Sequence, residues 1–390
     1  MSVDKREFEA LRGEPIAENS VAPEDVPCIE TSDPGRLCSA PLVSVYMITY
    51  NHARYVRQAI EGVMAQRTDF AYELVVGEDC STDETREICL DFQKRHPDRI
   101  RVLWWHENVS ALGGNGNRVL ARCRGEYVAM CEGDDYWTDP HKLQKQVDLM
   151  RAHPSAGECF GGVDFLSEVT GRVERYDCAR APAEFMSGRE FAWRMLFGRG
   201  SGGLYLQNLH YSAYMARRDV LLAARERFPD IWSWRLRLGD HIKFLSVAAQ
   251  SDVCFLREPV SVYRRNAFGV TGGNEGRLMR DGDLCKVYFA MAVFGLSFGE
   301  AVATFADRIV MHWIKSALRE TADGQRAMGA CILRSPVLQG LFARARCRAY
   351  LTAICKGRLT RRAYRLYRPW FSLVSHVFGR RRPRIEESRT

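Results

Sequence analysis

The sequence predicts an α/β protein with a mostly parallel sheet and helices on both of its faces. From residue 41 to about residue 156, apolar runs of strand length alternate with segments of helical periodicity. Polar residues follow each expected strand, and the carboxyl ends of parallel strands lie at one edge of a sheet. We therefore expect a ligand site at that edge.

Four strands are expected in this part of the chain. Residues 42–49 are apolar and rich in β-forming side chains, and the run is long enough for a buried strand. The other three runs of this type are 72–76, 100–105 and 126–131. Helical segments separate the four strands, which suits parallel pairing.

The helices between these strands have recognisable starts and ends. Apolar residues at helical spacing over 56–64 predict the first helix. Ser81 and Glu84 have the spacing of a capping box, so a second helix is expected to begin near Thr85 and to end before Pro97. Two further helices are expected, one through residues 119–120 and one that starts at residues 139–140.

The second half of the chain is less regular. Strands are expected at 204–206, 213–215, 252–256 and 260–263, and helices at 220–227, after residue 239 and from about residue 279 onward. Residues 1–40 are polar, acidic and punctuated by proline, which predicts a poorly ordered or loosely docked extension. The expected organisation is an extension over 1–40, an α/β domain over 41–275 and a helical, basic region over 276–390.

Composition places the chain among ordinary globular proteins, since 46% of its residues are hydrophobic and 27% are charged. The net charge of +8 is uneven: residues 341–390 hold 14 Lys and Arg against two acids, which leaves the rest at −4. Aromatic and aliphatic residues lie between the arginines at 361–362 and 380–382. This tail predicts peripheral contact with an anionic membrane; a solvated helix is the alternative, and nucleic acid is the least favoured partner.

The 13 cysteines show neither CxxC pairs nor the Cys/His spacing of zinc sites. Most lie in apolar stretches, where a free thiol behaves as a small apolar side chain. The first residues lack the apolar core of a signal peptide, and no run reaches the roughly 18 apolar residues of a membrane span. These features predict a cytoplasmic protein, at most peripheral on the membrane.

The most informative segment is the acidic cluster 132–135, Glu-Gly-Asp-Asp, directly after the expected strand 126–131. Carboxylates this close repel one another and are tolerated where water or a cation neutralises them. An isolated acidic cluster is usually a solvated turn, but the other three strands also end in polar residues: Thr49-Tyr50-Asn51, Glu78-Asp79 and His106-Glu107-Asn108. Oxygen ligands at such an edge suit Mg²⁺ or Mn²⁺ that holds the phosphates of a substrate.

Three motifs, in this order and at this spacing, resemble those of family 2 glycosyltransferases: residues 43–51, residues 77–85, and residues 125–127 with 132–135. The resemblance covers about residues 41–156 and continues more loosely to about residue 273. It implies the GT-A fold and an inverting transfer of sugar from a nucleotide-sugar, with UDP as the expected nucleotide. The lack of membrane spans and of a Gln-x-x-Arg-Trp motif argues against processive synthesis.

The resemblance also implies roles for residues around the nucleotide. Thr49, Tyr50 and Asn51 match the loop that lines the nucleotide pocket. Asp79 matches the carboxylate that accepts a hydrogen bond from the base. Asn117 lies where the family has polar residues near the nucleotide-sugar.

Asp134 and Asp135 match the acidic motif that meets the ribose and the metal-bound diphosphate. The chain departs from the family at three positions: Glu78 and Cys80 replace the usual Asp and Gly, and Glu132 replaces the Asp that starts the acidic motif. Glu78 is still expected at the donor pocket. Because the longer Glu132 side chain moves its oxygens, which of Glu132, Asp134 and Asp135 binds the metal directly stays open.

A general base must accept the proton of the attacking hydroxyl. Asp240 is the favoured candidate, because family members carry an acidic residue at a helix start at about this distance beyond the acidic motif. The alternative is that Asp240 only caps its helix, since helix N-termini favour carboxylates. His241 is the second candidate for the base and fits a structural role better.

Three other groups have roles that the sequence leaves open. His210 follows a glycine-rich stretch at 198–203 that is either a lid or an ordinary surface loop. Trp137 is either a platform for a sugar or a core side chain. Arg264 and Arg265 either grip the diphosphate or are solvated.

The expected function is transfer of a single sugar from a nucleotide-sugar to a saccharide or lipid-linked acceptor in cell-surface polysaccharide biosynthesis. A nucleotidyltransferase is one alternative, but it would usually carry a glycine-rich, basic loop after its first strand, and residues 50–54 are not such a loop. The other alternative is a catalytically degenerate scaffold at the membrane, against which the intact carboxylates argue.

Overall fold

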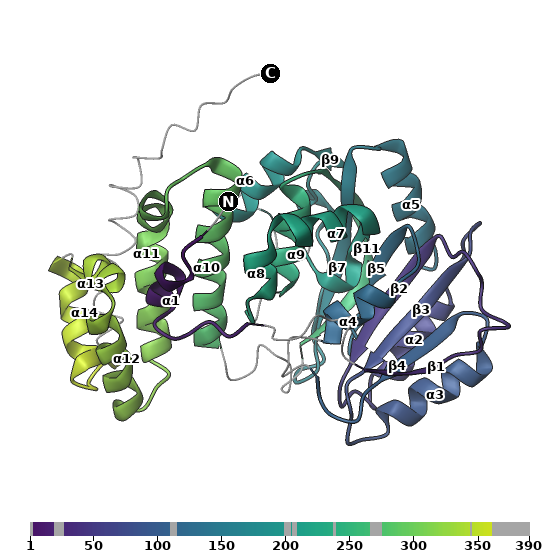
Figure 1. The fold of residues 1–390 in the computed structure, drawn as a ribbon, viewed down its shortest axis with the longest axis horizontal. Helices are drawn as coiled ribbons and strands as arrows, with labels where there is room; N and C mark the ends of the chain where they lie inside the picture. The colour runs from purple at the N-terminus through teal and green to yellow at the C-terminus, as the bar shows by residue number, and fades with distance from the viewer. Residues whose placement is uncertain are drawn as a thin grey trace. The chain divides into compact units, whose positions relative to one another are not determined.

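The computed structural model describes residues 3–18, 27–109, 115–198, 204, 209–236, 239–265, 275–343 and 345–360. The chain divides into two compact units, which we describe separately (Figure 1). The sheet unit comprises Glu18–Arg235 and Asp240–Gly269, and the helical unit comprises Met1–Ala17, Leu236–Gly239 and Val270–Thr390. The domain boundaries expected at residues 41 and 275 stay predictions.

The sheet unit is built on one mixed sheet, which has 11 strands in the described ranges. Their order is β1-β4-β3-β2-β5-β10-β7-β11-β6, with β8 beside β7 and β9 beside β11. The strands are β1 (Ile29–Thr31), β2 (Val43–Thr49), β3 (Tyr72–Glu78), β4 (Ile100–Trp104), β5 (Tyr127–Met130), β6 (Tyr136–Trp137), β7 (Ala156–Ser167), β8 (Val173–Glu174), β9 (Phe185–Met186), β10 (Met215–Arg217) and β11 (Asp252–Arg265). The neighbours β4, β3, β2 and β5 run parallel, as do β7 and β11, which confirms the predicted fold class.

Helices cover both faces of the parallel strands (Figure 1). They are α2 (Val56–Met64), α3 (Thr85–Arg95), α4 (Asn115–Arg122), α5 (Lys142–Ala152), α6 (Gly188–Phe197), α7 (Arg218–Arg227), α8 (Pro229–Ser233) and α9 (Gly239–Ala248), with short 3₁₀ turns η3 (Cys178–Arg180) and η6 (Tyr211–Ala213). Leu74 and Val76 of β3 share an apolar cluster with Ile60 of α2. Because side chains alternate along a strand, Gly77 faces the other way, where an added Cβ would lie 2.3 Å from Val119 of α4.

The sheet unit differs from the sequence prediction in several places: β7 and α6 were not expected, and β10 begins at Met215 rather than at residue 213. Two further differences concern α3 and β11. Helix α3 begins at Thr85 as expected, but without the predicted capping box, because Glu84 at the N-cap makes no side-chain cap. Asp83 instead accepts a hydrogen bond from the Thr85 backbone N–H at 3.1 Å. The two strands expected at 252–263 are one strand, β11, whose register with β7 shifts at Pro259, since proline cannot donate to the ladder.

The N-terminal residues contain more regular structure than the sequence predicted. Helix α1 (Lys5–Arg12) has Asp4 as its N-cap and ends at Gly13, which adopts a positive φ of 79°. The apolar side chains on α1 are too few to show a periodicity, and tertiary contacts hold the helix. Strand β1 lies at the edge of the sheet, antiparallel to β4. The expectation of an irregular segment is therefore wrong for these two stretches.

The helical unit contains the five helices that follow residue 275, in agreement with the predicted helical pattern. They are α10 (Glu275–Phe294), α11 (Phe298–Ala317), α12 (Ala322–Arg334), α13 (Pro336–Phe342) and α14 (Ala345–Cys355). Helix α1 belongs to this unit: Phe8 packs edge-on against Phe298, and Arg12 forms a buried ion pair of 2.9 Å with Asp281. No helix within the described ranges is long and apolar enough to cross a membrane. The basic tail, from residue 361 onward, lies outside them.

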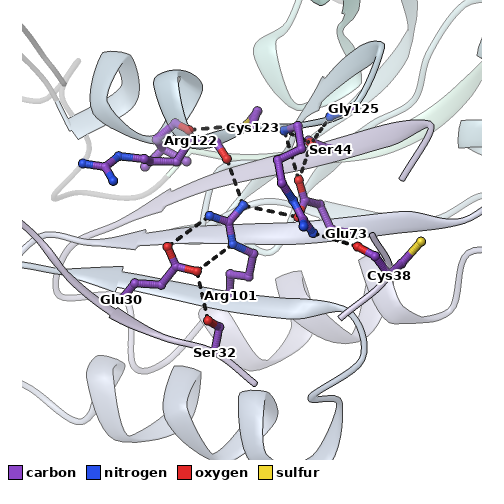
Figure 2. Close-up of polar contacts among 11 residues, drawn as sticks. Glu30, Ser32, Cys38, Ser44, Glu73, Arg101, Arg122, Cys123 and Gly125 are labelled. Atoms are coloured by element: carbon purple, nitrogen blue, oxygen red, sulfur yellow. Dashed lines mark hydrogen bonds and ion pairs between the residues drawn. The ribbon is translucent and has the colours of Figure 1, made fainter. Parts of the chain in front are cut away.

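A network of ion pairs and hydrogen bonds connects the strands at the amino edge of the sheet (Figure 2). Glu73, at the start of β3, accepts hydrogen bonds from the Ser44 hydroxyl at 2.7 Å, from Arg124 Nε at 3.0 Å and from Arg101 Nη1 at 3.3 Å. Arg101 of β4 also donates to both oxygens of Glu30 in β1, at 2.8 and 3.0 Å. The network thus joins β1, β2, β3, β4 and the turn that precedes β5.

Both carboxylates of this network are held in their charged forms. Burial alone would raise the pKa of Glu73, but hydrogen bonds from Arg124 and Ser44 and the charge of Arg101 outweigh it and lower that pKa. The hydrogen bond from Arg101 likewise lowers the pKa of Glu30, against the effect of its partial burial. The network therefore stabilises the fold only while these two groups are ionised.

We predict that Glu73→Gln lowers the free energy of unfolding by about 3 kcal/mol, because it removes the buried charge that Arg101 and Arg124 share, and Arg101 then keeps Glu30 alone. Urea unfolding monitored by circular dichroism measures the change. Glu126→Gln is the control, since Glu126 is exposed and lies 3.5 Å from Arg217; its effect should stay within about 0.5 kcal/mol. Equal effects of the two substitutions would contradict this account of the network.

The same network predicts an acid-sensitive part of the stability. Because the folded-state pKa of Glu73 lies below its ordinary value of 4.5, the stabilisation is complete above that pH and is lost as the pH falls through the folded-state value. Unfolding measured from pH 7 to pH 3 should therefore show a steeper loss of stability in the wild type than in Glu73→Gln. Parallel curves would contradict the prediction.

Candidate functional site

The carboxyl ends of β2, β3 and β5 bring the predicted polar residues to one edge of the sheet. Thr49 pairs in register with Glu78, and the two parallel strands end together. Backbone hydrogen bonds continue past the strands, from Asp79 N to Thr49 O at 3.0 Å and from Gly133 N to Ile48 O at 3.0 Å. The loop after β2, the loop after β3 and the acidic cluster are thus neighbours, as the sequence predicted.

Two of the three predicted metal ligands lie together, and a histidine joins them. One possible ligand atom from each of Glu132, Asp135 and His210 lies within 4.8 Å of the others. Asp134 instead lies on the side of His52, with 4.0 Å between its Oδ2 and Nε2 of His52. Glu132, Asp135 and His210 are therefore a candidate cation site, and Asp134 is not part of this group.

Asp135 is held by hydrogen bonds from two segments that are distant in the sequence. It is fully buried; its Oδ2 accepts a hydrogen bond from the Ser212 hydroxyl, and its Oδ1 accepts one from the Arg264 backbone N–H at 2.9 Å. The Ser212 oxygen also accepts a hydrogen bond from the Glu132 backbone N–H at 3.1 Å. Ser212 thus bridges the two acidic positions.

The electrostatics of this cluster fit a divalent cation. Burial raises the pKa of Glu132 and of Asp135 well above their ordinary values, and repulsion among the neighbouring carboxylates raises them further. Burial lowers the pKa of His210 to about 4, so its imidazole is neutral at physiological pH and has one lone pair. Nδ1 accepts a hydrogen bond from the Ser212 backbone N–H at 3.3 Å, which a cation bound at that nitrogen would replace. Two carboxylates and a neutral imidazole are a donor set that suits Mn²⁺, and a cation would offset their repulsion.

The loop after β3 places Asp79 in a buried position. Its Oδ1 accepts a hydrogen bond from the Val109 backbone N–H at 2.7 Å, and its carbonyl accepts one from the Asn108 side chain at 3.2 Å. Cys80, which follows it, has a positive φ of 60°. This left-handed conformation explains why the resembling family usually has glycine there, and a side chain at this position adds strain.

The other residues predicted at the nucleotide site differ in how many of their side-chain hydrogen bonds are already made within the protein. Asn51 has a positive φ of 54°, and its side-chain oxygen accepts a hydrogen bond from Thr82 N at 2.8 Å, so it shapes the turn. Both carboxylate oxygens of Glu78 are bonded within the protein, to Ser81 N and Arg86. Among the described residues, the buried Thr49 hydroxyl has no hydrogen-bond partner. Tyr50 is exposed after β2, and Asn117 is half-buried on α4.

Asp240 lies in the first turn of α9, at its predicted helix start. Its Oδ1 accepts a hydrogen bond from the adjacent His241 backbone N–H at 2.8 Å, and whether Asp240 is a base or only a helix cap stays a prediction. The charge of Asp240 also raises the pKa of Glu132. At His210 and Lys243, burial lowers the pKa and the charge of Asp240 partly opposes that effect. Asp240 therefore acts electrostatically on the acidic cluster from the first turn of α9.

The positions that the sequence left open are part of the protein framework. Trp137 is buried, and its Nε1 donates to Ser212 O at 2.6 Å, so it is a core side chain. The guanidinium of Arg264 bonds to Glu168 and Gln58, and Arg265 lies 4.2 Å above the Phe165 ring. Most of the predicted loop at 198–203 lies outside the described residues.

Sequence reasoning missed Ser212 and did not expect His210 to be a metal ligand. Both residues contact Asp135 from at least 75 positions further along the chain. They lie in the irregular segment that precedes β10. The polar run at residues 210–212 was the one signal in the sequence, and no spacing rule connects such a run to the acidic cluster. The irregular segment, therefore, completes a site that regular elements begin.

Comparison with known proteins agrees with these observations. The family model for glycosyl transferase family 2 matches residues 44–213. An uncharacterised protein of Mycobacterium bovis is 32% identical over 233 residues, which are 58% of this chain, and the chain spans 60% of that relative's length. The Bacillus subtilis protein EpsE, named as a glycosyltransferase, is 34% identical over 231 residues, which cover 59% of this chain and 78% of EpsE.

Solved structures show the same fold at low sequence identity. Staphylococcus aureus TarS, residues 1–349, matches with a TM-score of 0.54 and 16% identity over 86% of this chain and 91% of TarS. Its complex with UDP-GlcNAc matches with a TM-score of 0.52 and 16% identity over 86% of this chain and 92% of that one. The family model and the coverage of EpsE together establish that this chain belongs to glycosyl transferase family 2.

Proposed function

We propose that this protein transfers a single sugar from a nucleotide-sugar to a saccharide or lipid-linked acceptor, with inversion at the anomeric carbon. The observation that carries this proposal is the meeting of Glu132, Asp135 and His210 at the carboxyl edge of the sheet. A divalent cation held by these three residues would suit the diphosphate end of a nucleotide-sugar, whose negative charge grows as the bond to the sugar breaks. Family membership supports the same reaction class.

Glu132, Asp135 and His210 are the residues that we propose to hold Mg²⁺ or Mn²⁺. Bound there, the ion would act as a Lewis acid that stabilises the leaving diphosphate. Asp134 is not part of this set, and we propose that it serves the ribose side of the donor. Asp79 is the proposed acceptor of a hydrogen bond from the base, which requires a base with an imide or amide N–H, such as uracil.

UDP-GlcNAc is the first donor to test. The support is the shared fold with TarS, whose solved structures include complexes with UDP and UDP-GlcNAc. Relatives also suggest the setting: one Bacillus subtilis protein, 37% identical over 35% of this chain and 52% of its own length, is named for teichuronic acid biosynthesis. We therefore propose a role in assembly of a cell-surface polysaccharide.

We further propose that the reaction takes place in the cytoplasm, where a reducing environment keeps cysteines free. The 13 cysteines form no disulfide, and several, such as Cys89 and Cys131, are buried thiols whose pKa burial raises. Peripheral contact with the membrane through residues 361–390 stays a prediction, because that tail lies outside the described part of the chain. It would bring the enzyme to a lipid-linked acceptor.

The function is tested by incubating the full chain with a panel of UDP-, GDP- and dTDP-sugars and Mn²⁺, with release of the nucleotide as the readout. Turnover of one donor supports a transferase and excludes the degenerate scaffold. With added pyrophosphate, formation of a sugar 1-phosphate and a nucleoside triphosphate, with the sugar–phosphate bond intact, would indicate a nucleotidyltransferase instead. Binding without any turnover, across the panel and with added acceptors, would favour the scaffold.

We predict that Glu132→Gln stabilises the protein by about 1 kcal/mol in the absence of metal, because it removes the half-buried carboxylate that repels the buried Asp135. The same change should weaken Mn²⁺ binding at least tenfold, on the scale of about 10–100-fold seen when a metal site loses a supporting group. Thermal unfolding with and without Mn²⁺ measures both effects.

Glu107→Gln is the control for this prediction, since Glu107 is an exposed acid that follows β4 and is not among the proposed ligands. It should leave the Mn²⁺-induced rise in Tm intact. A full Mn²⁺ response in Glu132→Gln would show that Glu132 is not a ligand.

We predict that Asp240→Asn lowers kcat by a factor of about 100 or more, the usual range for loss of a general base, and leaves donor affinity unchanged. Asparagine also caps helices well, so the helix should persist. Steady-state kinetics with the active donor, together with calorimetric donor titration, separates the two quantities.

Asp219→Asn is a matched control for Asp240→Asn. Asp219 lies in the first turn of α7, is exposed, and accepts a hydrogen bond from the next backbone N–H at 2.8 Å, the same contact that Asp240 makes. If Asp240 were only a helix cap, the two variants would have the same small effect on kcat.

A further inference from the structure

Lys142 is a buried lysine that forms no ion pair with an acid in the described part of the chain. It is the first residue of α5, and its side chain is fully buried. In the described ranges, no carboxylate oxygen lies within 4.0 Å of its Nζ, and burial lowers its pKa to about 7. A buried ammonium without a counter-charge is costly, so its retention requires a reason.

The Lys142 ammonium contacts two side chains, Gln146 and Trp137, which donate hydrogen bonds to the segment of residues 210–213. Its Nζ donates to Gln146 Oε1 at 2.7 Å and lies 4.1 Å from the centre of the Trp137 ring. Gln146 Nε2 in turn donates to Ala213 O at 2.9 Å, and Trp137 Nε1 donates to Ser212 O at 2.6 Å. Two successive carbonyl groups of the segment are thus held by the neighbours of Lys142.

The same segment supplies the candidate metal site. Ser212 donates its hydroxyl hydrogen to Asp135 and accepts a hydrogen bond from the Glu132 backbone at 3.1 Å. His210 Nδ1 lies 3.7 Å from Asp135 Oδ2. A shift of the segment would therefore displace a proposed ligand and reorient the Asp135 carboxylate together.

We propose that Lys142 is a positioning residue of the candidate site, which acts through Gln146 and Trp137 to order residues 210–213. Lys142 itself touches neither donor nor metal in this scheme. Its effect on metal binding rests on the proposed function, whereas its effect on the order of the segment does not. In this scheme, the unfavourable burial of Lys142 is offset by the ordering of His210 and Ser212 at the site.

A purely structural role makes the opposite prediction. If Lys142 only filled space, methionine, which is unbranched and of similar length, would replace it without loss at the site. Replacing a buried charge with a well-packed apolar side chain is often neutral or stabilising. The two roles therefore differ in whether stability and the order of the site change together or separately.

The test uses the full chain carrying Lys142→Met. We expect an unchanged or higher Tm, faster hydrogen exchange of the backbone amides at residues 209–214 without metal, and Mn²⁺ binding weaker by about five- to tenfold in calorimetry. Trp137→Phe keeps the aromatic ring but removes the donor to Ser212 O, and it should show the same local increase in exchange. This second variant keeps the test decisive if Lys142→Met folds poorly.

Lys145→Met is the matched control on the same helix. Lys145 is partly exposed and pairs with Asp139 and Glu258, both at 2.7 Å. Its replacement should change neither exchange at 209–214 nor Mn²⁺ affinity. A double-mutant cycle adds a specific readout: Lys142→Met and Ser212→Ala should weaken Mn²⁺ binding less in combination than the product of their separate effects, because both act through one segment.

Unchanged exchange at 209–214 in both Lys142→Met and Trp137→Phe would overturn the proposal. Faster exchange with Mn²⁺ affinity equal to that of the wild type would also overturn it, because the segment would then not govern the site. A wild-type protein that binds no Mn²⁺ would instead contradict the proposed metal site of the function, and the exchange data alone would then decide the role of Lys142.

Discussion

Two carboxylates beside each other, the half-buried Glu132 and the buried Asp135, are the constraint on which the organisation of the sheet unit depends. Burial and mutual repulsion raise the pKa of both, so the cluster opposes folding unless hydrogen bonds and a cation compensate it. The compensating donors come from Ser212 and from the Arg264 backbone. Strand β5, the segment at 210–213 and strand β11 must therefore all be in place before the cluster can exist. A cation bound there would stabilise the whole unit by mass action.

The two edges of the sheet differ in how far ion pairs compensate their buried charges. At the amino edge, Glu73 and Glu30 are matched by Arg101 and Arg124, and the pKa of each acid is lowered (Figure 2). At the carboxyl edge, the pKa of Glu132 and of Asp135 is raised, and Lys142 is buried without an ion-pair partner among the described residues, although Arg86 matches the charge of Glu78 there. The first arrangement contributes stability, and the second sacrifices it. Departures from good pairing are expected where a ligand completes the structure, which is why we place the site at the carboxyl edge.

The parallel half of the fold and the position of its site were predictable, because they depend on local signals. Alternating strand and helix patterns fixed β2 to β5, and the polar residues that follow strands had to meet at one edge. The composition of the metal-binding set was not predictable, because His210 and Ser212 reach Asp135 through the irregular segment before β10. Helix α1 was missed for a related reason: Phe8 and Arg12 are held by residues more than 260 positions away, such as Asp281. Contacts of this kind leave no periodic trace in the sequence.

The central claim is that Glu132, Asp135 and His210 bind a divalent cation next to the diphosphate of a nucleotide. Anomalous X-ray scattering from crystals grown with Mn²⁺ and UDP tests it most directly, because it locates the metal without reference to activity. The account predicts one strong anomalous peak among these three side chains, with the diphosphate at the peak and the base near Asp79. Bound UDP with its metal elsewhere, or a peak at Asp134 that excludes His210, would contradict it.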